Sequence, residues 1–250
     1  MKVAHPLRKI GLARALSKLG YCSRSKAFEL IRNGRVRLNA NITRNPESPV
    51  HIGRDRIAVD EAFVQASEPI YLMMNKPRGV VTTASDEKGR ETVYEFLDQD
   101  LPWVGPVGRL DKASEGLLLL TNDSEWAAKI ATPETHLDKI YHVQIAIAAD
   151  ETLPGSLMTG VRTRNRPMLG VKQARILRRG EKNTWVEVVL DEGKNRQIRR
   201  IFEALGIGVL RLVRVAIGPL QLGDLPKRQV RRLSQAEKLA VDREIGRMET

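Results

Sequence analysis

The chain has 250 residues and carries a formal net charge of +12 at pH 7. A hydrophobic fraction of 42% allows one large or two modest packed domains. The excess of positive charge favours a polyanionic partner, nucleic acid ahead of an acidic membrane surface. We find neither an apolar run of about 18 residues nor a signal-peptide pattern, so we expect no membrane span and a cytoplasmic location.

Cysteine and histidine exclude two further classes of site. The single Cys22 cannot form an intrachain disulfide. The four histidines are scattered along the chain and have no zinc-binding spacing with that cysteine. We therefore expect no metal site.

Charge is concentrated at the N-terminal end. Residues 1–66 hold 13 Lys and Arg against 5 Asp and Glu, whereas the rest of the chain is nearly balanced. This difference predicts a small basic module, residues 1–66, joined to a larger domain over 67–236 and a charged tail over 237–250.

The basic module is expected to be helical first and stranded afterwards. Apolar residues at 12, 15, 16 and 19 have helical spacing, and Gly20 ends that helix. Ser23 or Ser25 can cap a second helix that ends at Gly34. Residues 35–38 alternate as a strand does, 39–41 form a plausible turn, and 57–59 indicate another strand.

Basic side chains cluster around the second helix and the strand after it. Two interpretations are open, a solvated surface and a phosphate-binding face, and the scarcity of acids favours the second. The residues are Arg24, Lys26, Arg32, Arg35 and Arg37.

The remaining chain alternates between strand and helix patterns without a regular repeat. Strands are expected over 70–75, 79–83, 116–121, 139–147, 185–190 and 209–215. Helices are expected over 92–97, after Asp123 or Ser124, and around 198–205. This order predicts an α+β fold with a mixed sheet.

Three segments could carry chemistry. Asp111 lies in a glycine-flanked loop directly before the apolar run 117–120, with Arg109 and Lys112 beside it. An ionised carboxylate next to apolar residues needs a cation to compensate it. An aspartate in such a loop is also a common turn or cap residue.

The second segment, residues 191–200, follows a strand and opens a helix. Its cations, Lys194 and Arg196 among them, surround a helix N-terminus that favours anions. Arg199 neighbours the apolar stripe of that helix, so partial burial would require an acidic partner. The third segment is the strand around Tyr141, whose apolar neighbours are equally typical of a core tyrosine.

These motifs, in order, resemble the RsuA-type pseudouridine synthases, which modify bacterial ribosomal RNA. The segment 108–118, GRLDKASEGLL, resembles their signature, and 75–79, NKPRG, resembles their upstream motif. Segments 139–141, KIY, and 192–200, EGKNRQIRR, resemble the two downstream motifs. Residues 1–66 resemble the alpha-L, or S4-type, RNA-binding motif, except that Ala40 stands where the module usually turns on Asn-Gly.

The resemblance implies roles for individual residues. Asp111 would be the nucleophile, Arg199 its ionic partner, and Tyr141 would stack on the uracil as the candidate base for carbon 5. Arg109 would fill the space of the flipped nucleotide, and Lys76 would support the site or touch phosphate. The resemblance further implies no cofactor and ribosomal RNA as the partner, either free or in a pre-ribosomal particle. Lys194 and Arg196 are expected to contact the RNA from the helix N-terminus, and nothing in the sequence suggests more than a monomer.

Two other functions compete with this one. A non-catalytic ribosome-assembly factor would need the basic module but not Asp111, Tyr141 and Arg199. A carboxylate-pair glycosidase would need a second acid, for which Glu115 is the nearest candidate. The sequence does not decide which uridine, or which ribosomal subunit, would be modified.

Overall fold

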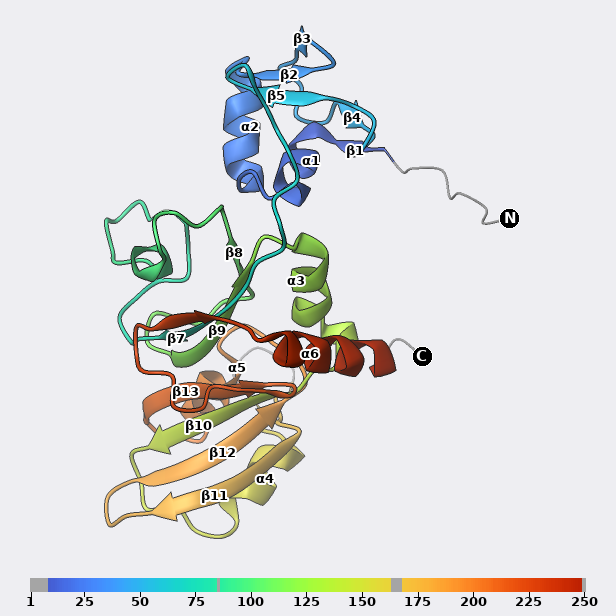
Figure 1. The fold of residues 1–250 in the computed structure, drawn as a ribbon. Coiled ribbons are helices and arrows are strands. Elements are labelled where there is room, and N and C mark those ends of the chain that lie inside the picture. Colours follow the sequence, from blue (N-terminus) through green and yellow to red (C-terminus); the bar gives the residue numbers. More distant parts are fainter. Residues whose placement is uncertain (1–8, 85, 163–167, 249–250) are drawn as a thin grey trace. The chain divides into compact units, whose positions relative to one another are not determined.

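The computed structural model describes residues 9–84, 86–162 and 168–248. The chain divides into two compact units (Figure 1). The N-terminal unit comprises residues up to Tyr71 together with 98–105 and 120–125, and the C-terminal unit comprises 72–97, 106–119 and the chain from Trp126 onward. Within the described ranges, no helix is long and apolar enough to cross a membrane.

The N-terminal unit contains two short helices and two small antiparallel sheets, one of two strands and one of four. The two helices and the strands near 35–38 and 57–59 are those that the sequence predicts. Ser23 is the N-cap of the second helix, where its hydroxyl accepts a 3.1 Å hydrogen bond from the Lys26 amide. The elements are β1 (Ile10–Gly11), α1 (Leu12–Lys18), α2 (Arg24–Arg32), β2 (Val36–Leu38), β3 (Asn41–Ile42), β4 (Pro49–Val50), β5 (Ile57–Val59) and β6 (Ala62–Phe63).

The hairpin between β2 and β3 keeps a tight turn although Ala40 replaces the usual glycine. Asn39 and Ala40 both have positive φ, of 52° and 71°. Two successive positive φ values are the requirement of a type I′ hairpin turn. The unusual residue therefore does not change the sign of φ at either central position, but it places a side chain in the left-handed region.

The C-terminal unit is built on a mixed, largely antiparallel sheet, which confirms the α+β prediction. Its strand order is β11-β12-β10-β13-β9-β7-β15, with β8 and β14 paired at its side. Strand β13 pairs with β9 in parallel. The strands are β7 (Tyr71–Lys76), β8 (Gly105–Val107), β9 (Glu115–Thr121), β10 (Lys139–Ile145), β11 (Gln173–Arg179), β12 (Thr184–Leu190), β13 (Val209–Ile217), β14 (Leu220–Gln221) and β15 (Val230–Arg232).

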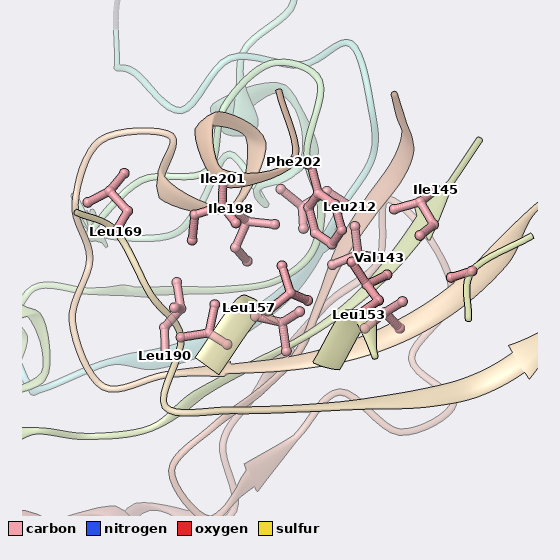
Figure 2. Packing of buried hydrophobic residues seen from close by; sticks show 14 residues of the cluster. Val143, Ile145, Leu153, Leu157, Leu169, Leu190, Ile198, Ile201, Phe202 and Leu212 are labelled. Atoms are coloured by element: carbon pink, nitrogen blue, oxygen red, sulfur yellow. The ribbon is translucent and has the colours of Figure 1, made fainter. Parts of the chain in front are cut away.

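Helices complete this unit. They are η1 (Val93–Phe96), α3 (Ser124–Ala131), η2 (Pro133–Thr135), α4 (Leu153–Thr159), α5 (Gln197–Ala204) and α6 (Gln235–Met248). Side chains of α4 and α5 meet the apolar face of β10, β12 and β13 in one buried cluster (Figure 2). Phe202 and Leu157 in this cluster are fully buried. Their close packing fixes the position of α5 on the sheet.

Two expectations from the sequence are wrong. Residues 79–83 form no strand and make only an isolated bridge between Val81 and Thr92. The charged tail expected over 237–250 is instead helical as far as Met248, and α6 buries Val241 and Ile245 completely or nearly so. Asp242 of that helix also accepts a 3.0 Å hydrogen bond from the Trp126 indole.

Candidate active site

The loop that carries Asp111 is held by its backbone carbonyls. Thr82 donates to the Leu110 carbonyl at 2.8 Å, and the Gly79 amide donates to the Lys112 carbonyl at 2.8 Å. Arg199 donates to the Ala113 carbonyl at 2.8 Å. Together with the Lys76 bonds described next, every carbonyl from residue 110 to 114 accepts a hydrogen bond, which fixes the loop before any ligand arrives.

Lys76 is a buried support of this loop and not a phosphate contact. Its side chain is 0% exposed. The ammonium group donates to the carbonyls of Pro77, Asp111 and Ser114 at 3.1, 3.2 and 3.0 Å. Three acceptors use all three of its N–H bonds, so none is left for RNA. Of the two roles that the sequence left open for Lys76, the structure is compatible only with support.

The ion pair at Asp111 comes from Arg196. Arg196 Nη1 lies 3.4 Å from Asp111 Oδ2, and the Asp111 side chain is one-third exposed. Arg196 is the N-cap of α5 and has a φ of 49°, a left-handed conformation that is unfavourable for a non-glycine residue. Backbone strain of this kind persists where the surrounding structure enforces it, often at functional sites.

Arg199 supports the same loop from behind. Its guanidinium binds the Ala113 carbonyl, and among the described residues no acid lies within ion-pair distance of it, so the expected Arg199–Asp111 pair is not formed. Burial lowers the pKa of Arg199, the neighbouring charge of Arg196 lowers it further, and Asp111 opposes both. Arg199 thus lies close to both members of the pair while contacting the backbone.

Buried Gln197 shapes the segment before α5. Its amide donates to the Gly170 carbonyl at 3.0 Å and to Glu192 at 2.7 Å, and it accepts from the Lys194 amide at 3.3 Å. These bonds tie the 192–196 turn to the body of the unit. They position Arg196 for its contact with Asp111.

Tyr141 comes to the site from the centre of the sheet. It lies on β10, directly opposite Val188 of β12 and Arg214 of β13. Directly paired residues project from the same face of a sheet, so Tyr141 and Arg214 are side by side. Two residues along β13, Leu212 shares this face and lines the same pocket.

A single pocket collects these residues. It has a volume of about 730 Å³ and is lined by Asp111, Tyr141 and Arg196, together with Arg109 and Lys194. Sites for small ligands typically measure about 300–1,000 Å³, so a nucleotide fits. Arg199 lines no part of it among the residues described. The pocket lies wholly within the C-terminal unit.

The pocket is positively charged. Among the described lining residues, eight side chains are cationic and four are acidic. Arg109 and Lys194 are exposed, and Lys194 pairs with Glu192 at 2.8 Å. Such an excess attracts phosphate groups. In the described chain, no cluster of His, Cys, Asp or Glu could hold a metal ion.

The glycosidase hypothesis does not fit this geometry. Glu115 is buried, does not line the pocket, and is paired with Arg211 at 3.1 Å and Lys227 at 2.7 Å. A carboxylate held by two cations is not available as the second acid of a hydrolase.

The five basic residues predicted for the N-terminal module differ in how free they are. Arg35 pairs with Asp60, Arg37 with Glu61, and Lys26 with Glu29. Arg24 is exposed and has no ion pair among the described residues, and Arg32 lies over the Phe28 ring at 5.9 Å. Of these five residues, Arg24 and Arg32 are therefore the least committed to partners within the described part of the chain.

Sequence reasoning missed Arg214 and gave no role to Lys139. Both line the pocket, and Arg214 is 6% exposed. The available signal was an arginine on the buried face of the alternating strand 209–215, where Leu212 and Ala216 are its neighbours.

Comparison with known proteins was consistent with this geometry. The family model of the RNA pseudouridylate synthases matches residues 70–204, and that of the S4 domain matches residues 10–57. The chain is 35% identical to ribosomal large subunit pseudouridine synthase B of Bacillus subtilis over 90% of this chain and 93% of that protein. It is 34% identical to an uncharacterized RNA pseudouridine synthase of Aquifex aeolicus over 96% of both chains.

A solved structure agrees with the sequence comparisons. A crystal structure of a pseudouridylate synthase superimposes with a TM-score of 0.66 at 29% identity, over 93% of this chain and 99% of the other. The similarity therefore extends over both units. The chain belongs to the RNA pseudouridylate synthase family, a family of isomerases, and carries an S4 domain ahead of its catalytic domain.

Proposed function

We propose that this protein converts a specific uridine of ribosomal RNA into pseudouridine, with Asp111 as the nucleophile. The observation that carries the proposal is the Asp111 carboxylate, paired with Arg196 and lining the same pocket as Tyr141. The Bacillus subtilis relative is named as an enzyme of the large ribosomal subunit, so large-subunit RNA is the substrate we propose first.

The reaction needs the target nucleotide outside the RNA stack, because its reacting atoms are inaccessible within a helix. The pocket has room for one such nucleotide. Exposed Arg109 borders this pocket next to Asp111 and is our candidate for occupying the space that the flipped nucleotide leaves. Tyr141 is our candidate for stacking on the flipped uracil.

The proposed chemistry is a rearrangement in which atoms balance. An Asp111 oxygen attacks the C1′ carbon of the ribose, and the bond from C1′ to N1 breaks, so the base leaves with the electron pair. The base turns over and carbon 5 attacks C1′, which displaces the carboxylate. The proton on carbon 5 is lost and N1 gains one, so no redox partner is consumed.

Arg196 is the ionic partner of the nucleophile. Its guanidinium lies 3.4 Å from the Asp111 carboxylate oxygen and lines the same pocket. Tyr141 is also our candidate for accepting the proton of carbon 5.

Pseudouridine mapping tests the proposal in cells. Ribosomal RNA from cells lacking this protein should have lost a specific pseudouridine, and expression of the wild-type chain should restore it. Asp111→Asn should not restore it at equal protein level. A complete pseudouridine map in the deletion cells would show that this RNA is not the substrate, and restoration by Asp111→Asn would overturn the role of Asp111.

A further inference from the structure

Arg214 is a buried cation with one guanidinium nitrogen that finds no hydrogen-bond partner in the described part of the chain. Its side chain is 6% exposed, and Nε donates to the Leu117 carbonyl at 2.8 Å. Nη2 is buried without a hydrogen-bond partner, and no acid pairs with this guanidinium in the described part of the chain. A buried, unpaired polar group is costly unless something supplies an acceptor.

A second cation, Lys139, lies beside it and has no ion pair among the residues that the structure describes. Lys139 lines the same pocket, and burial lowers its pKa, as does the charge of nearby Arg214. The acids that oppose this effect, Asp138 and Asp191, are engaged elsewhere, with Lys172 at 2.7 Å and His136 at 3.5 Å. Two neighbouring cations without a bound counter-charge make a site for an electron-rich group of a ligand.

The position of this pair indicates which part of a nucleotide it meets. Of the cationic side chains among the described lining residues, Arg214 alone is buried, whereas those of Arg109, Lys112, Lys194 and Arg196 are exposed. The phosphates of a flipped nucleotide stay joined to the RNA chain and must remain near the entrance. The group that reaches a buried side chain is therefore the base.

The sheet register agrees with this assignment. Arg214 is directly opposite Tyr141 on the neighbouring strand, so both project from the same face. A base stacked on Tyr141 would present its edge to the neighbouring guanidinium. Uracil offers two carbonyl oxygens at its edges, and flipped bases are read by hydrogen bonds to such edges.

We infer that Arg214, with Lys139 beside it, binds a carbonyl oxygen of the flipped uracil and stabilises the charge on the base after it leaves the sugar. This inference rests on the proposed function. When the bond from C1′ to N1 breaks, the electron pair of that bond spreads from N1 onto the carbonyl oxygens. A fixed cation at one of them acts as a preorganised donor does at a developing oxyanion.

Rate and affinity variants separate this role from a phosphate contact. The full-length protein, its Arg214→Gln and Lys139→Gln variants and ribosomal RNA from deletion cells are compared in single-turnover pseudouridine formation with enzyme in excess. Arg214→Gln should slow the reaction at least about 100-fold at saturation, and Lys139→Gln about tenfold. The Kd for RNA should change less than about twofold, with the same salt slope.

Arg178→Gln is the matched control, because Arg178 is an exposed strand arginine that lines no part of the pocket. It should react at the wild-type rate. A raised Kd for Arg214→Gln, a salt slope reduced by about 0.7 and an unchanged saturating rate would instead assign Arg214 to a phosphate and overturn the base contact.

Substrate analogues keep the test decisive if Arg214→Gln does not fold. Arg214→Lys retains the charge, and thermal unfolding checks its fold. Transcripts with 2-thiouridine or 4-thiouridine replace one carbonyl oxygen by sulfur, a weaker acceptor. The rate ratio of wild type to Arg214→Lys should shrink towards one with one of the two analogues. An unchanged ratio with both would overturn the inference.

Failure of the inference is distinguishable from failure of the proposed function. If the wild-type protein forms no pseudouridine in any ribosomal RNA, the proposed function fails and the inference fails with it. If the wild type is active and Arg214→Gln matches it in rate, only the inference fails.

Discussion

The Asp111 carboxylate is paired with Arg196, whose Nη1 lies 3.4 Å from Oδ2, while Arg199 binds the backbone of the same loop at Ala113. The two arginines are three positions apart on the segment that opens α5. One is exposed and touches the carboxylate, and the other is half-buried and holds a carbonyl. This division predicts that their substitutions have different effects.

Arg196→Gln should lower the rate of pseudouridine formation without lowering stability. It removes the cation beside Asp111 but no buried hydrogen bond. Arg199→Gln should lower both the rate and the stability. It should reduce the free energy of unfolding by about 1–3 kcal/mol, because it leaves the Ala113 carbonyl without its donor. Urea unfolding and single-turnover rates measure the two effects. Equal destabilisation by both substitutions would contradict the division.

Lys76 should make the reaction sensitive to alkaline pH. Burial lowers its pKa from 10.5 to about 8, against the opposing charges of Asp111 and Glu115. Above about pH 8 the neutral amine has two N–H donors for three carbonyls, so the Asp111 loop loosens and the rate should fall. A rate measured from about pH 6.5 to about pH 9.5 should decline with a midpoint near 8.

The stability of the fold should not follow that decline. Between about pH 8 and 10.5 the unfolded chain retains a proton that folded Lys76 has released. The contribution of this group therefore makes the free energy of unfolding rise with pH across that window. Lys76→Met should remove the alkaline decline in rate. A wild-type rate that stays constant to about pH 9.5 would contradict the role of Lys76.

Gly116 should tolerate no side chain. It has a φ of +102°, and a Cβ atom there would lie 2.2 Å from the Arg214 carbonyl oxygen on the paired strand. Gly116→Ala should reduce the free energy of unfolding by about 2–4 kcal/mol, because both the backbone and β13 must shift. Gly246→Ala, where no atom lies within 4 Å, is the control and should change it by about 1 kcal/mol or less. Equal effects would mean that β9 and β13 adjust freely.

The N-terminal module should bind RNA mainly through Arg24 and Arg32. Arg35 and Arg37 are already paired with Asp60 and Glu61, so they contribute less free charge. The double substitution to Gln at 24 and 32 should weaken RNA binding and reduce the salt slope by about 1.4–1.8, more than the same change at 35 and 37. Filter binding across a salt series measures both slopes. Identical slopes for the two double variants would contradict this ranking.

The sequence predicted the strongly periodic elements well. The apolar run 117–120 is the buried core of β9, and the stripe at Ile198, Ile201 and Phe202 is the buried face of α5. In both segments, the positions of the apolar residues in the sequence match the positions that are buried in the structure. Residues 79–83 also look like a strand, but their hydrogen bonds support the Asp111 loop, as the Gly79 amide and Thr82 hydroxyl show.

Elements with weak patterns were missed. β11 is an edge strand in which most residues are exposed, so its alternation carries little apolar signal. The charge of α6 concealed Val241 and Ile245, which anchor it four positions apart. Their helical spacing was visible, but the partner surface that buries them could not be read from the chain.

The candidate site shows the same limit. The loop motif identified Asp111, whereas the ionic partner depends on the left-handed backbone at Arg196, which no spacing rule predicts. Arg214 depends on strand register, because it faces the pocket only through its pairing with Tyr141 and Gly116. Register is set by the whole sheet and not by a local motif.

The central claim is that the Asp111 carboxylate attacks the flipped nucleotide. The most direct measurement compares the purified wild-type protein and Asp111→Asn in single-turnover pseudouridine formation on ribosomal RNA from deletion cells, with the Kd for the same RNA measured in parallel. We predict that the asparagine variant binds RNA within about twofold of wild type and is slower by about 1,000-fold or more. A variant that binds the RNA and still forms pseudouridine at a wild-type rate would contradict the account.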